Sequence, residues 1–243
     1  MPTPDRERSE EPTVGALVPA RGGSKSIPGK NLELLGEKPL VAWPIDTANA
    51  TPEIDEVFLT TDDEDIASAG REFGATVIER PAALASDDAL VIDAIVHAVR
   101  WMEDREVAPD RLTLLEPTCP FRAVEDVRAC LDRLDDGYDS AATFVEAAVN
   151  PHRTWTLDGG EPETFVEGAN PWLPRQQLPE AYQLNGGCYA FETAAIDRAD
   201  GPGLLFGRSA GVRMPPERSV DIDSPVDLTV ARTLVEEGRQ GEP

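Results

Sequence analysis

The sequence predicts an α/β fold, with a mostly parallel twisted sheet and helices on both faces. Short apolar runs typical of buried strands alternate along the chain with longer segments whose apolar residues recur at helical spacing. Loops rich in glycine and proline separate the two kinds of segment. Strands that alternate with helices pair in parallel, because each helix returns the chain to the same end of the sheet.

The first predicted elements are strands at 14–18, 56–61 and 75–78 and helices at 39–50 and 61–73. The first strand is apolar and ends at Pro19. Pro44 is compatible with the first helix only near its first turn. Asp62 and Asp63 favour the start of the second helix, because negative charge there complements the helix dipole.

The next predicted elements are a helix that follows residue 88 and ends near 103, a strand at 111–115, a helix at 124–134 and a strand at 140–145. The first of these helices is predicted from apolar residues at helical spacing, namely Val91, Ile95, Ala98, Val99 and Met102. The proline-containing stretch 116–122 ends the strand that precedes it.

The loops that follow the first four strands are predicted to converge. They span residues 19–31, 61–63, 80–88 and 116–122. Ligands of open parallel sheets bind beyond the carboxyl ends of the strands. All four loops should therefore lie on one edge and form the rim of a single active site.

From Asn150 to Glu180 the pattern changes, with Trp155, Trp172 and five prolines in a weakly periodic stretch. We interpret it as an inserted lobe with short strands, whose exposed aromatic residues suit a subunit contact. A long surface loop is the alternative. Strands resume at 187–191 and 211–214, and a last helix ends near 237. The predicted organisation is a disordered tail, 1–12, followed by one domain at 13–238 with the lobe at about 150–180.

The composition limits the classes of partner. A formal charge of −24 argues against nucleic acid. No apolar run reaches the roughly 18 residues of a membrane helix, so no membrane association is expected. Three cysteines without paired spacing indicate a reducing cytoplasm. Many acids with only three lysines suggest a halophilic source, because concentrated salt screens self-repulsion. An ordinary acidic cytoplasmic protein is the alternative.

The loop after the first strand is the most informative stretch. Its charged residues, Arg21, Lys25 and Lys30, are all basic, although acids outnumber bases about two to one in the chain, 46 to 22. A glycine-rich loop that leaves a strand can aim N–H groups at an anion, while the cations supply counter-charge. We therefore predict an anion-binding loop, with an ordinary basic loop as the alternative. Its other candidate residues are Gly22, Gly23, Ser24 and Asn31.

A second candidate site is the sequence Asp221-Ile222-Asp223 near the C-terminus. Residues two apart on an extended segment point to one face, and two carboxylates can hold Mg²⁺ together with water and phosphate oxygens. The alternative is that these acids only complement the following helix, for which Ser224 and Pro225 form a good start.

Two further stretches contain candidate binding residues. Arg175 can hold a carboxylate with two parallel hydrogen bonds, and Arg153 is a second cation in the same lobe. The alternative is a pair of surface arginines. Arg80 and Ser86 bracket a loop that could present hydrogen-bonding groups to a pyrimidine edge.

These stretches together resemble the CMP-sialic acid synthetases (acylneuraminate cytidylyltransferases) over nearly the whole chain. The resemblance rests on five stretches in the same order, namely 16–31, 80–87, 114–122, 174–186 and 219–228. It implies a Rossmann-like nucleotidyltransferase fold. It also implies a homodimer in which the inserted lobe reaches the partner subunit, so that some sugar contacts cross the interface.

The resemblance also implies roles for the candidate residues. The nucleotide CTP would contact Arg21, Gly22, Gly23, Ser24, Lys25, Lys30, Asn31, Arg80 and Ser86. Asp221 and Asp223 would hold Mg²⁺ or Mn²⁺, and with Arg21 and Lys25 they would be catalytic. A sugar acid would contact Glu116, Arg153, Arg175, Gln176 and Tyr189. Two residues depart from the family pattern, since Glu116 stands where glutamine is usual and Arg153 where lysine is common.

The function expected from the resemblance is transfer of CMP from CTP to the anomeric hydroxyl of a 2-keto-3-deoxy sugar acid, sialic acid or a related nonulosonic acid, with release of diphosphate. One alternative is a nucleotidyltransferase for another small substrate, such as a sugar phosphate or an isoprenoid alcohol phosphate. A catalytically silent nucleotide-binding protein is the other. The presence of Lys25, Asp221 and Asp223 argues against the silent protein.

Overall fold

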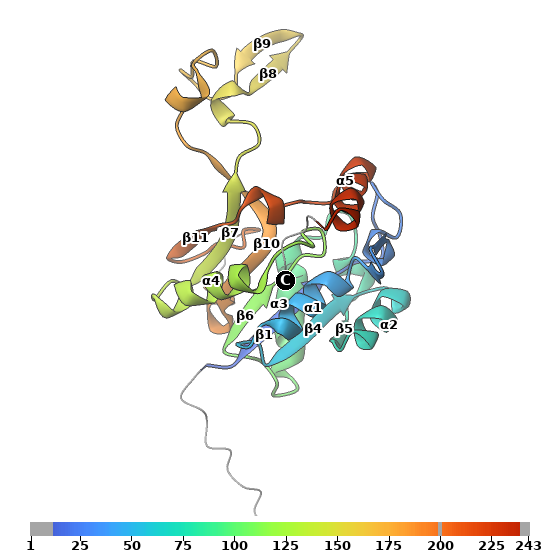
Figure 1. Ribbon diagram of the computed structural model, residues 1–243. Coiled ribbons are helices and arrows are strands. Elements are labelled where there is room, and N and C mark those ends of the chain that lie inside the picture. The colour runs from blue at the N-terminus through green and yellow to red at the C-terminus, as the bar shows by residue number, and fades with distance from the viewer. Residues whose placement is uncertain (1–11, 199–200, 239–243) are drawn as a thin grey trace, which may run out of the picture.

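The computed structural model describes residues 12–198 and 201–238, so the first eleven residues of the predicted disordered tail lie outside it. A seven-stranded sheet runs through the described part of the chain in the order β11-β7-β10-β6-β1-β4-β5 (Figure 1). The strands are β1 (Val14–Pro19), β4 (Glu56–Thr61), β5 (Thr76–Glu79), β6 (Arg111–Leu114), β7 (Ser140–Glu146), β10 (Tyr182–Glu192) and β11 (Ser209–Arg213). Only β10 pairs antiparallel to its neighbours, β6 and β7, so the predicted mostly parallel sheet is confirmed.

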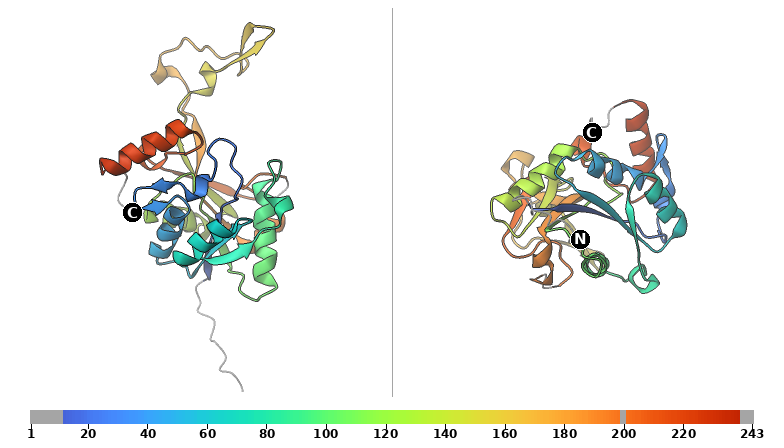
Figure 2. Two further views of the ribbon diagram at one scale, coloured as in Figure 1. Left: turned by 90° about the vertical axis from the view of Figure 1, so that its right-hand side faces the viewer. Right: turned by 90° about the horizontal axis from the view of Figure 1, so that it is seen from below.

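Helices cover both faces of the sheet (Figure 2). They are α1 (Ala42–Ala50), α2 (Glu64–Glu72), α3 (Val91–Glu103), α4 (Val124–Asp135) and α5 (Pro225–Glu236). Along β1, Ala16 and Val18 pack in a core with α1, α2 and α4, whereas Leu17 packs on the opposite face with α3. This alternation follows from the two-residue period of a strand and divides the core into two layers.

Several boundaries differ from the predicted ones for local reasons. Helix α1 begins at Ala42 rather than 39, because Lys38–Pro39 (β3) pairs with Leu34–Leu35 (β2). In α3 Ile92 is buried, whereas Val91, one of the apolar residues that predicted the helix, is its first residue and is 44% exposed. Strand β10 begins at Tyr182, five residues before the predicted start, because Tyr182–Leu184 pair with β7 ahead of an irregularity in the ladder.

The inserted segment contains a hairpin of β8 (Trp155–Asp158) and β9 (Glu161–Thr164). It projects from the ends of β7 and β10, well away from the sheet (Figure 1). Short strands were expected here. No helix among the described residues has the length and apolar composition needed to cross a membrane.

A third, smaller core joins segments that are far apart in sequence. Ile27 of the basic loop, Phe121 and Ile222 pack together with Leu228 and Ala231 of α5. Burial of these side chains holds the basic loop, the loop after β6 and the Asp221–Asp223 segment against one another. The hydrophobic effect thus assembles the edge of the sheet where the polar candidates lie.

Candidate active site

A pocket of about 510 Å³ opens at the carboxyl ends of the parallel strands. It is lined by Pro19, Arg21, Gly23, Ser24, Lys25, Ser26, Lys30, Asn31, Arg80, Asp87, Val91, Glu116, Pro117, Thr118, Asp221 and Asp223. Three of the four predicted rim loops line it directly. The fourth, after β4, supports it from behind, because Asp62 Oδ1 accepts the Gly22 N–H at 2.9 Å.

The basic loop folds back on itself through a buried asparagine. Asn31 is 8% exposed and donates its Nδ2 to the Arg21 carbonyl at 2.9 Å. Gly29 has a φ of 66°, a left-handed conformation that glycine adopts without strain, and it precedes the short helix Lys30–Leu32. Gly22 faces Asp62 and does not line the pocket, whereas Gly23 does.

Two cations of this loop are paired with the loop that follows β5. Lys25 Nζ lies 2.8 Å from Asp87 Oδ2, and Arg21 Nη1 lies 3.4 Å from Asp87 Oδ1. Arg21 also donates to the Ser86 carbonyl at 2.8 Å. The hydrogen bond from Lys25, and then the two positive charges, lower the pKa of Asp87. Ser86 itself is absent from the pocket lining, and its hydroxyl donates to the Ala83 carbonyl.

Arg80 lies at the back of the pocket and is 8% exposed. Its Nη2 donates to the Thr60 carbonyl at 2.8 Å and its Nε to Thr60 Oγ1 at 3.3 Å. Burial lowers its pKa to about 10, so the guanidinium remains charged at neutral pH. Arg80 therefore presents a fixed cation with further N–H groups toward the pocket.

Asp221 and Asp223 both line the pocket, on either side of the fully buried Ile222. The Ile222 N–H donates to the Thr118 carbonyl at 2.8 Å, which fastens this segment to the loop after β6. Lys30 Nζ donates to the Ile222 carbonyl at 2.9 Å and to Asp223 Oδ1 at 3.2 Å. Desolvation and then the negative charge of Asp223 raise the pKa of Asp221.

Helix α5 begins with Ser224 as its N-cap and Pro225 as its first residue, the start that the sequence predicted. Ser224 caps the helix by accepting the Asp227 N–H, and Asp227 in turn accepts the Ser224 N–H. Neither Asp221 nor Asp223 caps the helix, and both line the pocket. The described residues contain no group of three or more His, Cys, Asp or Glu placed to hold a metal. Two carboxylates facing a pocket suit Mg²⁺, which keeps several waters and takes its other ligands from a substrate.

Glu116 adds a third acid to the pocket lining. Burial, followed by the charge of Asp221, raises its pKa to about 7. Its Oε2 comes so close to Gly186 that a Cβ there would lie 2.6 Å away, and Gly186 also has a φ of 65°. Glycine at position 186 thus makes room for the Glu116 carboxylate.

Sequence patterns did not indicate two residues that organise the site. Arg122 is 2% exposed and donates to the main-chain carbonyls of Glu116 and Gly187, so that it joins the loop after β6 to β10. Asp87 neutralises Arg21 and Lys25. The only sequence signal for Arg122 was its place at the end of an apolar strand-and-loop motif. The only signal for Asp87 was an acidic residue opposite the basic loop.

The predicted sugar-binding residues are not brought to this pocket within one chain. Arg153, Arg175 and Gln176 line a separate pocket of about 650 Å³ at the base of the lobe. There Arg175 Nη2 pairs with Glu146 Oε1 at 2.5 Å, and Arg153 Nη2 donates to the Leu173 carbonyl at 2.7 Å. Tyr189 lines neither pocket and is 8% exposed in β10, where burial and then the charge of Glu116 raise its pKa.

The fold and this pocket define an α/β protein that presents cations and a pair of carboxylates at the carboxyl edge of its sheet. Residues 15–198 match the family model described as cytidylyltransferase, and the chain belongs to that family. The family and the α/β fold expected from the sequence are confirmed.

Three proteins illustrate the similarity. The chain is 38% identical to an N-acylneuraminate cytidylyltransferase of Escherichia coli, over 90% of this chain and 51% of that protein. It is 29% identical to a CMP-N,N'-diacetyllegionaminic acid synthase of Legionella pneumophila, over 91% of this chain and 95% of that protein. A solved CMP:2-keto-3-deoxy-manno-octonic acid synthetase complexed with CTP superposes with a TM-score of 0.69 at 18% identity, over 93% of this chain and 99% of the other, and so shares the fold.

The chain spans about half the length of the N-acylneuraminate cytidylyltransferases that it matches. The Legionella protein shows that relatives of about this length also exist. Membership of the family therefore does not depend on the part of the longer proteins that this chain does not cover.

Proposed function

We propose that this protein transfers CMP from CTP to the anomeric hydroxyl of a 2-keto-3-deoxy sugar acid, sialic acid or a related nonulosonic acid, and releases diphosphate. The observation that carries the proposal is that one pocket brings three cations, Arg21, Lys25 and Lys30, together with the carboxylates of Asp221 and Asp223. Cations can bind a triphosphate, and carboxylates can hold the metal that accompanies it. The names of the relatives from Escherichia coli and Legionella support the substrate class.

The proposed reaction forms a bond from the sugar hydroxyl oxygen to the α-phosphorus of CTP and breaks the bond from that phosphorus to the diphosphate oxygen, while the hydroxyl proton passes to water. Arg21, Lys25 and Lys30 stabilise negative charge on the phosphates. Arg80, which lines the pocket, holds the base. Asp221 and Asp223 would hold Mg²⁺ or Mn²⁺, which would supply Lewis-acid stabilisation of the CMP group during its transfer.

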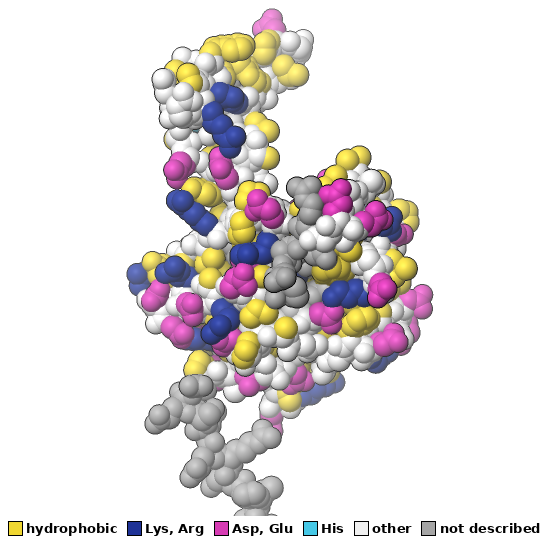
Figure 3. All heavy atoms as spheres, viewed as in Figure 1, with side chains coloured by type: hydrophobic (Ala, Val, Ile, Leu, Met, Phe, Trp, Pro, Cys, Tyr) yellow, Lys and Arg dark blue, Asp and Glu magenta, His cyan; other side chains and the backbone are white. Residues whose placement is uncertain are grey.

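The sugar site we propose is completed by a second copy of the chain. Arg153 and Arg175 lie on the lobe, whose exposed apolar side chains gather near its tip (Figure 3). Four large apolar side chains of the lobe are exposed, Trp155 (41%), Leu157 (73%), Phe165 (67%) and Trp172 (84%). Burial of this patch against a partner subunit would bring the lobe's arginines toward the partner's pocket. The protein is accordingly proposed to be a homodimer.

Two further properties are part of the proposal. The three cysteines are free and buried, which supports a reducing, cytoplasmic location. The charge of −24 with only three lysines supports adaptation to concentrated salt.

The test is a diphosphate-release assay with CTP, ATP, GTP and UTP against nonulosonic acids, octulosonic acids, sugar phosphates and isoprenoid alcohol phosphates. We expect turnover with CTP and a nonulosonic acid only. Turnover of a sugar phosphate or an isoprenoid phosphate instead would establish one alternative, and binding of CTP without any turnover would establish a catalytically silent protein.

Light scattering at micromolar concentration tests the dimer. A Leu157→Ser/Trp172→Ser double variant should be a monomer that still binds CTP but no longer turns over the sugar acid. A wild-type monomer with full activity would contradict the proposed interface.

A further inference from the structure

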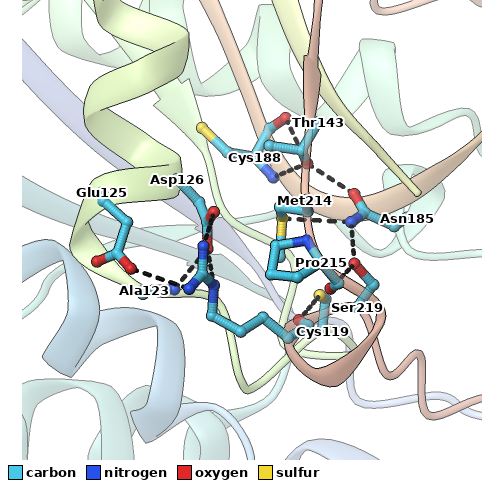
Figure 4. Close-up of polar contacts among 11 residues, drawn as sticks. Cys119, Ala123, Glu125, Asp126, Thr143, Asn185, Cys188, Met214, Pro215 and Ser219 are labelled. Atoms are coloured by element: carbon cyan, nitrogen blue, oxygen red, sulfur yellow. Dashed lines mark hydrogen bonds and ion pairs between the residues drawn. The ribbon is translucent and has the colours of Figure 1, made fainter. Parts of the chain in front are cut away.

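A polar network outside the pocket lining connects the residues just before the Asp221–Asp223 segment to α4 and β10 (Figure 4). Arg218 donates Nε to Asp126 Oδ2 at 2.9 Å and Nη2 to Asp126 Oδ1 at 2.8 Å. Its Nη1 lies 2.9 Å from Glu125 Oε1. The two bonds to Asp126 form a fork, the geometry in which an arginine and a carboxylate fix each other's orientation.

Asp126 is itself held rigidly. It is 3% exposed in the first turn of α4, and its Oδ2 also accepts the Ala123 N–H at 2.9 Å. The next residue of α4, Val127, is fully buried in the main core. The fork therefore connects Arg218 to a helix that packs in the main core.

The neighbouring residue, Ser219, is anchored from the opposite side. Its hydroxyl accepts Asn185 Nδ2 at 2.9 Å and donates to the Pro215 carbonyl at 2.9 Å. Asn185 is 3% exposed in β10, and its Oδ1 accepts the Thr143 hydroxyl of β7 at 2.7 Å. Two adjacent residues are thus tied to α4 and to the sheet.

The segment that these anchors hold has no secondary structure of its own. Residues 219–223 belong to neither a helix nor a strand. After Ser219 the next fixed point is Ile222, whose N–H donates to the Thr118 carbonyl and whose side chain is fully buried. Asp221 lies between these two points, so its direction depends on both of them.

Asp126 is buried and the Arg218 side chain is 22% exposed, so desolvation of the carboxylate offsets part of the attraction between the two charges. The fork fixes the direction of the Arg218 side chain whatever its net contribution to stability. We propose that Arg218, through its fork to Asp126, is a positioning residue that aims Asp221 and Asp223 at one shared divalent cation in the pocket. The inference rests on the proposed function only for the part that the cation plays in catalysis. Binding of the cation can be measured without turnover, so the inference can be tested separately.

The test measures binding of Mn²⁺ alone by electron paramagnetic resonance. Arg218→Lys keeps the charge but loses the fork, and Ser219→Ala removes the second anchor without changing charge. We expect each variant to bind Mn²⁺ on the order of tenfold more weakly, the lower end of the effect of residues that support metal ligands. At saturating Mg²⁺ the KM for CTP should change less than about twofold, since the cations of the basic loop are untouched.

Arg128→Met is the matched control, because Arg128 lies on the same helix and forms an exposed ion pair with Glu53. It should bind Mn²⁺ as the wild type does, and melting temperatures will show whether all variants are folded. Wild-type affinity for Mn²⁺ in Arg218→Lys would overturn the proposal whatever Ser219→Ala shows, as would a wild-type protein that binds no Mn²⁺. If the variants bind Mn²⁺ more weakly but the wild type turns over no sugar acid, the positioning role is supported and only the proposed function is refuted.

Discussion

Lys25 Nζ lies 2.8 Å from Asp87 Oδ2, so a lysine of the basic loop is already paired with a carboxylate from the loop after β5. The same carboxylate lies 3.4 Å from Arg21 Nη1. In the free protein the Asp87 carboxylate therefore occupies the position in which Arg21 and Lys25 would bind an anionic ligand. The pair is exposed, and exposed ion pairs are weak enough for a multivalent anion to displace.

We expect Asp87→Asn to bind inorganic tripolyphosphate about two- to fivefold more tightly than the wild type, because the internal competitor is removed. Titration calorimetry at low salt measures the change, which should fade as KCl is raised. Asp88→Asn is the control, since it removes the same charge one residue along the chain from another exposed side chain. Equal effects of the two variants, or weaker binding by Asp87→Asn, would refute the competition.

The assigned metal site predicts the behaviour of Asp223→Ala. The variant should fold normally, because α5 is capped by Ser224 and Asp227, yet lose turnover by on the order of a thousandfold. EDTA should have a similar effect on the wild type. Asp65→Ala, which removes an exposed acid from α2, should remain fully active. Undiminished turnover of Asp223→Ala, or of the wild type in EDTA, would rule out the metal assignment.

The raised pKa of Glu116 predicts how stability depends on pH. Its pKa rises from the ordinary 4.5 to about 7 in the folded protein, so between those values the folded state holds a proton that the unfolded state has released. Stability should therefore fall as pH increases across this range, by at most about 3 kcal/mol. Glu116→Gln carries no charge and should escape this loss.

Thermal melts of both proteins in EDTA at pH 5 and pH 8 measure the difference. The variant should melt higher than the wild type at pH 8, and by much less at pH 5. If the melting temperature of Glu116→Gln exceeds that of the wild type by the same amount at pH 5 and at pH 8, Glu116 is ionised in the folded protein at both pH values.

Glu116 also predicts substrate preference. An ionised carboxylate only accepts hydrogen bonds. Next to the negative charge of a sugar acid, an ionised Glu116 is unfavourable unless it meets a hydroxyl or N–H. We expect the preferred sugar to differ from plain N-acetylneuraminate in the tail that reaches Glu116, with a di-N-acylated acid of the legionaminate type as one candidate. The measurement is kcat/KM of wild type and Glu116→Gln across a panel of sugar acids. An unchanged ranking would mean that Glu116 does not set specificity.

The acidic surface predicts a requirement for salt. A formal charge of −24 opposes both compaction and the approach of anionic substrates, and dissolved ions screen both effects. Activity and melting temperature should rise together from low to multimolar KCl. Full activity and an unchanged melting temperature at low salt would remove the hypothesis of salt adaptation.

The sequence by itself determined the elements and the edge on which the site lies. Apolar spacing is a local property, so it located the strands and helices to within a few residues, as with α4 at Val124–Asp135. Parallel pairing then required the loops after β1, β5 and β6 to meet, and they line one pocket. The basic loop and the Asp221–Asp223 pair were visible because their composition contrasts with the rest of the chain.

Only the tertiary structure decided which side chains face one another. Lys30 and Asp223 are 193 positions apart, and Arg218 and Asp126 are 92 apart. No spacing rule connects such pairs, because their contact depends on how distant segments pack, α5 and the loops around Ile27, Phe121 and Ile222 and α4 in the main core. The same reason separates Arg153 and Arg175 from the pocket, since the lobe that carries them projects from the ends of β7 and β10. Packing of distant segments, which no local pattern encodes, therefore set the geometry of the site.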